Sequence, residues 1–261
     1  MFTFMPRLRT RYLTRTVMCL RIALIGGTIE ALELAHHLLE KNDVIIIEME
    51  AELGLPVNHP GRVIDPNILN TYFTSEQQTF LALQPNSDGW GCRWDWIMKH
   101  LAANIARHGV QFLTRTRVLS STKTNQTIHL ELTSTERDQP TLLTVDRLVL
   151  TESSDKRGPG NRQHSLSPHP PMRLSFPATF PWFGGTVVSE DATSAPGPNL
   201  CLSRGDGMTE LWWHDRPLWS PSRGFIEQCT PHLSENLEDL SFDGAVLRAL
   251  EQLPTCVLPE K

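Results

Sequence analysis

The stretch that decides the fold is RIALIGGTIEALELAHHLLEKNDVIIIE, residues 21–48. Residues 22–25 form a short, continuous apolar run, which predicts a buried parallel strand. Apolar residues at helical spacing follow from Ile29, and the run 44–47 predicts a second buried strand. A parallel pair joined by a helix is right-handed, so the turn at Gly26 is expected at the carboxyl edge of a sheet.

The turn after the first strand carries a damaged dinucleotide-binding fingerprint. In the pattern G-x-G-x-x-G the three positions are Gly26, Thr28 and Ala31. Gly26 meets the need for a tight turn, whereas Thr28 puts a β-branched side chain where bare backbone approaches a pyrophosphate. Gly27 and the helix N-terminus still offer N–H groups to an anion. Glu48, 22 residues after Gly26, stands where an acid binds a ribose hydroxyl. Together these features predict dinucleotide binding.

Two other interpretations of the same residues stay open. Gly26 and Gly27 form only a tight turn in the first, and Glu48 is a solvated acid at a strand end. In the second, the turn and the acid bind another nucleotide-like ligand, such as S-adenosylmethionine. A methyltransferase would continue with alternating strands and helices, and the sequence after residue 110 does not.

The rest of the chain predicts an α/β protein with a β-rich end. Breakers dominate residues 50–90, where we expect an irregular excursion with a helix near residues 66–73. A helix is predicted at 94–108 and a strand at 110–113. An antiparallel meander follows within 117–145, and a return strand at 147–150. The expected fold is a Rossmann-like FAD/NAD(P)-binding domain with this meander, plus a small second domain. The expected divisions are an N-terminal extension at 1–20, the binding domain at 21–151, a linker at 152–172 and the second domain at 173–261.

Composition excludes several function classes. The 24 basic and 29 acidic residues give a net charge of −5, which argues against nucleic-acid binding. No run of 18 apolar residues predicts a transmembrane segment. Five scattered cysteines, without a Cys-x-x-Cys pair, predict neither a disulfide framework nor a zinc site. We therefore expect a cytoplasmic protein without a metal.

Residues 1–20 contain several arginines and no acid, which fits an organellar transit peptide. The simpler interpretation is that Met18 is the true start, because residues 19–21 lead directly into the first strand. Under the first interpretation the protein is organellar, and under the second it is cytoplasmic.

Several segments, in order, match one known family. They are residues 24–27, 37–38, 44–48, 53–57 with Gly61, 92–102 with Gly109, 116–118 and 146–150. In this order the chain resembles the FAD-dependent monooxygenase and geranylgeranyl reductase superfamily over residues 20–155.

The resemblance implies an FAD-dependent oxidoreductase whose reductant is NAD(P)H. It implies that Arg93 contacts the phosphates or the ribityl chain of FAD, and that the backbone of Val118 contacts adenine. With Gly26, Gly27, Thr28 and Glu48, these residues form the expected cofactor site. The expected substrate is a small, apolar molecule, because aromatic side chains can line such a pocket. No catalytic acid or base is identified, and a partner chain or an oligomer is left open.

Departures from the family favour an alternative. Residues 151–154 (Thr-Glu-Ser-Ser) stand where the family has Ala-Asp-Gly. Gly205-Asp206 matches the family's Gly-Asp motif, but a strand-like segment follows it, so a hairpin turn is expected there. The second half is also short. The alternative is a non-catalytic binding or scaffold protein that kept the Rossmann fold and lost FAD chemistry.

Overall fold

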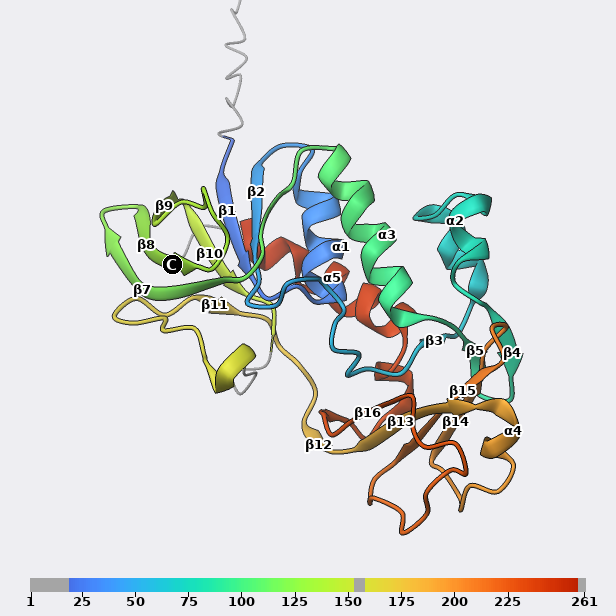
Figure 1. Ribbon diagram of the computed structural model, residues 1–261. Coiled ribbons are helices and arrows are strands. Elements are labelled where there is room, and N and C mark those ends of the chain that lie inside the picture. The colour runs from blue at the N-terminus through green and yellow to red at the C-terminus, as the bar shows by residue number, and fades with distance from the viewer. Residues whose placement is uncertain (1–18, 153–157, 258–261) are drawn as a thin grey trace, which may run out of the picture.

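The computed structural model describes residues 19–152 and 158–257. Figure 1 shows a parallel sheet with helices on one side, a meander on the other and a separate group of strands below. The transit-peptide interpretation concerns residues that lie almost wholly outside this description. Residues 153 and 154, in the segment that stands where the family has Ala-Asp-Gly, also lie outside the described residues. Within the described residues, no helix is long and apolar enough to cross a membrane.

The parallel sheet has the strand order β11-β10-β1-β2-β6, and its pairs are all parallel. The chain leaves β1 toward β2 and β6, and later returns to the other side of β1 as β10. The order therefore reverses between β1 and β10, where open α/β sheets bind their ligands. The strands are β1 (Arg21–Ile25), β2 (Asp43–Ile47), β6 (Gln111–Leu113), β10 (Arg147–Leu150) and β11 (Met172–Arg173).

Two hydrophobic cores lie on the two faces of this sheet. Ile22 and Leu24 of β1 point to the helices, while Ala23 and Ile25 point to the meander. This alternation explains why β1 is apolar at every position from Ile22 to Ile25. The helices are α1 (Ile29–Leu38), α3 (Trp94–Arg107) and α5 (Phe242–Val257), and the meander strands are β7 (Thr116–Thr124), β8 (Thr127–Ser134) and β9 (Leu142–Val145).

The segment between β2 and α3 is the irregular excursion that the sequence predicts. The helix expected near residues 66–73 is present as a short 3₁₀ helix. Its N-cap is Asp65, whose side chain accepts a hydrogen bond from the backbone N–H of Asn67. The elements here are β3 (Arg62–Val63), η1 (Pro66–Thr71), α2 (Ser75–Thr79), β4 (Gln84–Asn86) and β5 (Gly89–Gly91).

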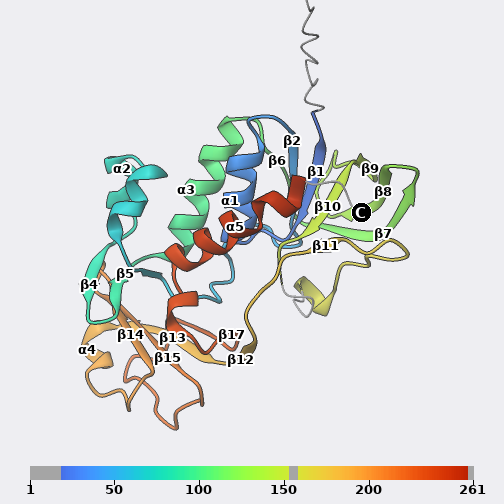
Figure 2. The ribbon, with the colours of Figure 1, turned by 180° about the vertical axis from the view of Figure 1, so that it is seen from behind.

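The second group of strands is antiparallel, with the order β14-β15-β13-β16 in its main sheet and β12 paired with β17. The turn at Gly205–Gly207 joins β14 and β15 as a hairpin, as predicted. Figure 2 shows this group from behind, below α5. Its elements are β12 (Thr179–Pro181), β13 (Phe183–Val188), α4 (Ser189–Ala192), β14 (Leu200–Ser203), β15 (Met208–Trp213), β16 (Glu227–Cys229), β17 (His232–Ser234) and η3 (Leu237–Asp239).

Buried polar contacts join the irregular excursion after β2 to the antiparallel group of strands. Glu210 of β15 is 2% exposed, accepts a hydrogen bond from the backbone N–H of Gly61 at 2.8 Å, and pairs with Arg204 at 3.1 Å. A Cβ atom on Gly61 would lie 1.9 Å from the carbonyl oxygen of Cys92, so this position needs glycine. The loop that leads from β2 to β3 is thus fixed against β15.

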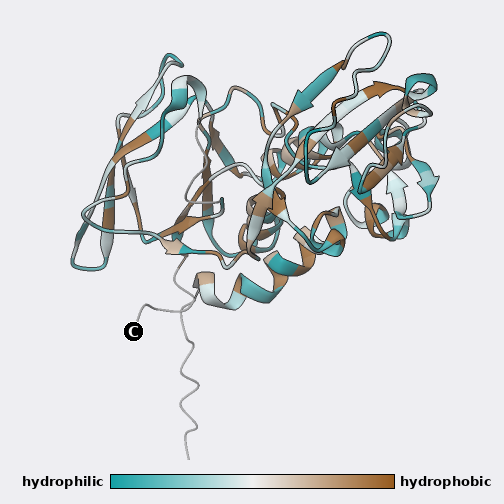
Figure 3. Cartoon of the chain, turned by 90° about the horizontal axis from the view of Figure 1, so that it is seen from below, coloured by the Kyte–Doolittle hydropathy of each residue, from teal (hydrophilic) through white to brown (hydrophobic). Residues whose placement is uncertain are grey.

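The predicted linker region contains more structure than expected. Its residues 159–161 form a short 3₁₀ helix, η2 (Pro159–Asn161), and its end, β11, adds a strand to the parallel sheet beside β10. The last helix, α5, packs against α1. Figure 3 shows hydrophobic residues gathered on the strands and hydrophilic residues on many connecting turns.

Candidate functional site

The loops after β1 and β10 meet at the reversal of strand order. Gly26 adopts φ +104°, a conformation that favours glycine, and a Cβ atom there would lie 2.7 Å from Glu152 Oε2. Thr151 donates its hydroxyl to the backbone carbonyls of this turn, at 2.8 Å for Gly26. The crevice at this point is therefore narrow and is occupied by the chain's own side chains.

Thr28 is the N-cap of α1. Its hydroxyl oxygen accepts a hydrogen bond from the backbone N–H of Ala31 at 3.2 Å and donates to the carbonyl of Thr151 at 2.9 Å. The residue that breaks the glycine fingerprint thus satisfies one of the free N–H groups at the start of the helix. An incoming phosphate would find one donor fewer at this helix end.

Glu48 lies beside the turn and is 2% exposed. Its Oε2 accepts a hydrogen bond from the backbone N–H of Gly27 at 2.7 Å. Its Oε1 accepts from the backbone N–H groups of Met49 at 2.6 Å and Glu50 at 3.1 Å. These three donors stabilise the charged carboxylate and hold it in one orientation at the end of β2.

A second carboxylate lies in the first turn of α1. Glu30 is buried and pairs with Arg248 of α5 at 2.8 Å. Arg248 also contacts Asp239 at 3.4 Å. The positive end of the helix dipole is therefore next to an acid of its own chain, which favours the helix and disfavours a further anion. No local sequence pattern indicates this pair, because its members are 218 positions apart.

Arg93 and Val118, which the resemblance alone implies, contact residues other than those of the Gly26 turn. Arg93 pairs with Asp95 at 3.0 Å, and its guanidinium lies 5.3 Å from the ring of Trp96. Val118 is fully buried in β7. Its backbone N–H donates to Nδ1 of His164 at 3.1 Å, and its carbonyl accepts from Ser165 at 2.9 Å.

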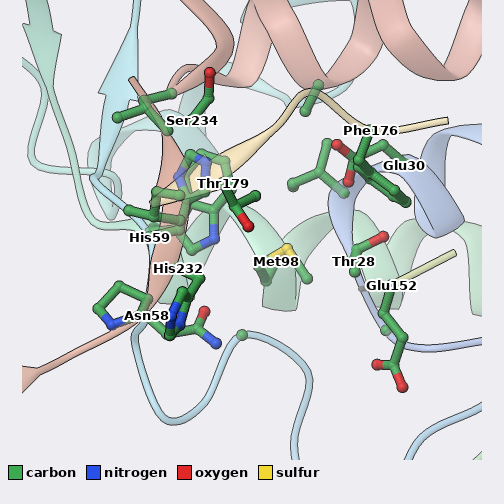
Figure 4. Close-up of a pocket in the computed structure, with 18 of the residues that line it drawn as sticks. Thr28, Glu30, Asn58, His59, Met98, Glu152, Phe176, Thr179, His232 and Ser234 are labelled. Carbon is green, nitrogen blue, oxygen red and sulfur yellow. The ribbon is translucent and has the colours of Figure 1, made fainter. Parts of the chain in front are cut away.

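A cavity of about 750 Å³ extends from the Gly27–Thr28 turn to the second group of strands. In Figure 4, Thr28, Glu30 and Glu152 lie at one end, His59, Asn58 and His232 at the other, and Met98 between them. Arg93 and Val118 do not line it, whereas Gly27, Thr28 and Glu48 do. Its walls combine charged residues with apolar ones that include Leu55, Pro56, Trp94, Met98, Leu174, Phe176, Pro177, Pro231, Leu233 and Leu240. Volume and lining are those of a small-molecule site.

His59 is another residue of this cavity that sequence reasoning missed. Its ring stacks on Trp94, with ring centroids 4.2 Å apart, and its Nδ1 donates to the carbonyl of Pro60 at 2.9 Å. Burial lowers its pKa to about 4, so the ring is neutral at pH 7 and its Nε2 is a hydrogen-bond acceptor. The only local signal is the Pro-Gly pair that follows it.

The cysteines do not form a nucleophilic or metal site. All five are free, and burial raises the pKa of the Cys92 thiol well above its usual value. In the described ranges, no group of three or more His, Cys, Asp or Glu side chains is arranged to hold a metal ion.

Comparison with known proteins shows the fold. No protein-family model and no curated protein matches the sequence. Solved structures do. The p-nitrophenol 4-monooxygenase of Pseudomonas putida has a TM-score of 0.58 at 11% identity, over 92% of this chain and 80% of that one. A geranylgeranyl bacteriochlorophyll reductase-like protein of Thermoplasma acidophilum has a TM-score of 0.60 at 12% identity, over 91% and 77%. The fold is that of the flavin monooxygenases and related reductases.

A third similar structure is longer. The anhydrotetracycline hydroxylase of Streptomyces rimosus has a TM-score of 0.51 at 11% identity, and the match covers 83% of this chain but 52% of that one. The expected α/β fold and the resemblance to this superfamily are confirmed at the level of the fold.

The residues fit one end of FAD better than the other. The large cavity beyond the turn suits the flavin and ribityl end, whereas the turn at Gly26 and the acid Glu48 stand where the pyrophosphate and the adenosine ribose would lie. The resemblance assigns adenine to the backbone of Val118, and residues 164 and 165 are bonded to that backbone. In this conformation the adenine end does not fit.

Proposed function

We propose that the protein is an FAD-dependent oxidoreductase of the flavin monooxygenase and reductase type. The cavity at the carboxyl end of β1 carries this proposal. It begins at Gly27 and Thr28, passes Glu48 and ends at the second group of strands. Cofactor sites of α/β sheets lie at this position, where the strand order reverses. The similar folds of a monooxygenase, a hydroxylase and a reductase-like protein support the same class.

In this proposal Gly26, Gly27, Thr28 and Glu48 hold the cofactor near the turn. The resemblance adds Arg93 and Val118, which the cavity does not include. FAD, when bound, supplies hydride or oxygen chemistry, and NAD(P)H is the proposed source of electrons. The protein's contribution is to orient the ligand and exclude water.

The apolar part of the cavity wall suits a small, apolar substrate. The five free cysteines support a reducing, cytoplasmic compartment. A partner chain or an oligomer belongs to the proposal as an open possibility.

A second candidate is a non-catalytic binding protein on the same fold. The occupied backbone of Val118 and the three acids around the turn, Glu30, Glu48 and Glu152, favour it. A pyrophosphate would add negative charge next to these carboxylates, which opposes binding. The two candidates differ in whether FAD enters the cavity.

The test is the visible absorption spectrum of the purified protein, before and after incubation with FAD and removal of free ligand. Flavin bands, with FAD released on denaturation, support the oxidoreductase. A colourless protein that retains no FAD at millimolar concentrations contradicts it and favours the second candidate.

A further inference from the structure

The segment between η2 and β11 lies along the free edge of β7. In the sheet β7-β8-β9, β7 is an edge strand. Ser121 of β7 donates its N–H to the carbonyl of Ser167 at 3.1 Å and accepts from the N–H of His169 at 2.9 Å. The hydroxyl of Ser121 also donates to the carbonyl of His169. Figure 1 shows this segment running beside β7 before it reaches β11.

The same segment reaches the glycine turn through two side chains. The His164 side chain is 4% exposed, and its Nε2 lies 3.9 Å from Oε1 of Glu152. The carboxylate of Glu152 in turn lies against Gly26. A continuous set of contacts thus runs from β7 to the turn, across the crevice at the reversal of strand order.

We propose that residues 164–169 form an internal cover over the nucleotide edge, which competes with the adenine half of FAD for the backbone of Val118. This inference rests on the proposed function. The imidazole of His164 accepts the hydrogen bond of the Val118 N–H, as a ring nitrogen of adenine could. The N–H of Ser165 donates to the Val118 carbonyl, as an exocyclic amine could.

The way the cover is held makes it displaceable. Three of its six residues (Ser165, Ser167 and Pro168) are exposed, and Leu166 is its one hydrophobic side chain that packs on the core beneath the meander. Backbone hydrogen bonds at an exposed edge, with little apolar burial, mark segments that open locally at low free energy. A ligand that replaces the same hydrogen bonds can therefore take the place of the cover.

The experiment compares His164→Ala with the wild-type protein by equilibrium dialysis against FAD, adenosine monophosphate (AMP) and flavin mononucleotide (FMN). His164→Ala removes the acceptor for the Val118 N–H and the contact with Glu152. Loss of about one hydrogen bond corresponds to roughly a tenfold change in affinity. The variant should bind FAD and AMP about tenfold more tightly and FMN, which lacks the adenine half, unchanged. His36→Ala, on an exposed part of α1, is the matched control and should change none of them.

A second variant locks the cover in place. Ser121 and Pro168 form an isolated parallel bridge, so S121C/P168C brings two thiols to the spacing of a disulfide. The oxidised form should bind FAD and AMP more weakly than the reduced form of the same preparation. Because both states are one folded protein, misfolding cannot imitate this difference.

The outcomes separate the two proposals. The cover proposal is overturned if wild type, His164→Ala and both forms of S121C/P168C bind AMP with the same affinity and also bind FAD with the same affinity. Binding of neither ligand by any form counts as such equality. If His164→Ala gains AMP affinity but no form binds a flavin, the cover stands and the oxidoreductase falls.

Discussion

At the β7 end of the crevice, the backbone of Val118 is bonded to the chain's own residues, whereas at the far end His59 and Trp94 border an open cavity. The first end is closed by hydrogen bonds along an exposed edge. The second is held open by a loop fixed through Gly61 and Glu210. The difference indicates that the open end accepts a ligand directly, and that the closed end must first release its cover.

The largest effect is expected at the anchor of the open end. Glu210→Gln removes the charge that balances Arg204 in a buried setting, so the free energy of unfolding should fall by about 3 kcal/mol. Urea denaturation measures it. Glu190→Gln, in the exposed pair with Arg223, should change the same quantity by less than about 0.5 kcal/mol. Equal effects of both variants would show that Glu210 does not fix the loop.

A second variant tests the same contact between Gly61 and Glu210 by a change in the loop. Gly61→Ala should lower the free energy of unfolding by about 2–3 kcal/mol, because its Cβ atom would lie 1.9 Å from the carbonyl oxygen of Cys92. Gly109→Ala is the control. Gly109 has φ +108° and nothing within 4 Å of a Cβ atom, so only the backbone strain of about 1 kcal/mol is expected. A smaller loss for Gly61→Ala than for Gly109→Ala would contradict the tight contact.

The neutral imidazole at the open end predicts a dependence of stability on pH. His59 has a pKa of about 4 in the folded state and about 6.5 when unfolded, so the unfolded chain binds more protons between these values. Stability should therefore fall as the pH drops from 6.5 toward 4. The contribution lost between pH 7.5 and pH 5 is about 2 kcal/mol at most, since water in the cavity reduces it.

His59→Gln tests this account, because glutamine is polar and does not titrate. Urea denaturation at pH 7.5, 6 and 5 should show a shallower decline for the variant than for wild type. His108→Gln, at an exposed helix end, should keep the wild-type slope. Parallel curves for His59→Gln and wild type would mean that His59 is not buried as a neutral ring.

The smallest effect is expected at Thr28, in the turn between the two ends of the crevice. Thr28→Gly restores the second glycine of the fingerprint but removes the cap of α1 and the hydrogen bond to Thr151, so the free energy of unfolding should fall by about 1 kcal/mol. FAD affinity should rise, because the backbone N–H of Ala31 is freed. Thr28→Ser keeps the hydroxyl and should leave both quantities close to wild type. An unchanged FAD affinity in Thr28→Gly would show that Thr28 does not obstruct the phosphates.

Sequence patterns predicted the elements whose signals are local. The apolar runs of β1 and β2, the helical spacing of α1 and α3, and the hairpin at Gly205 all appear in the structure. Each depends on residues within one short stretch, where periodicity and turn chemistry act.

The features that the sequence did not predict depend on contacts between distant parts of the chain. The pairing of Glu30 with Arg248 joins α1 to α5, and β11 is a strand of two residues within a Pro- and Ser-rich segment. The bond between Val118 and His164 likewise joins β7 to a segment that composition predicts to be a linker. Thr28 and Glu48 could be found in the sequence, but the cover on the backbone of Val118 could not.

The most direct test of the central claim is a parallel titration of wild-type protein and His164→Ala with FAD, followed by flavin absorption after free ligand is removed. We predict flavin bands in both, with about tenfold tighter binding in His164→Ala. Two colourless proteins at saturating FAD would contradict the claim that this cavity holds a flavin. Flavin bands of equal affinity would contradict the claim that residues 164–169 cover its adenine end.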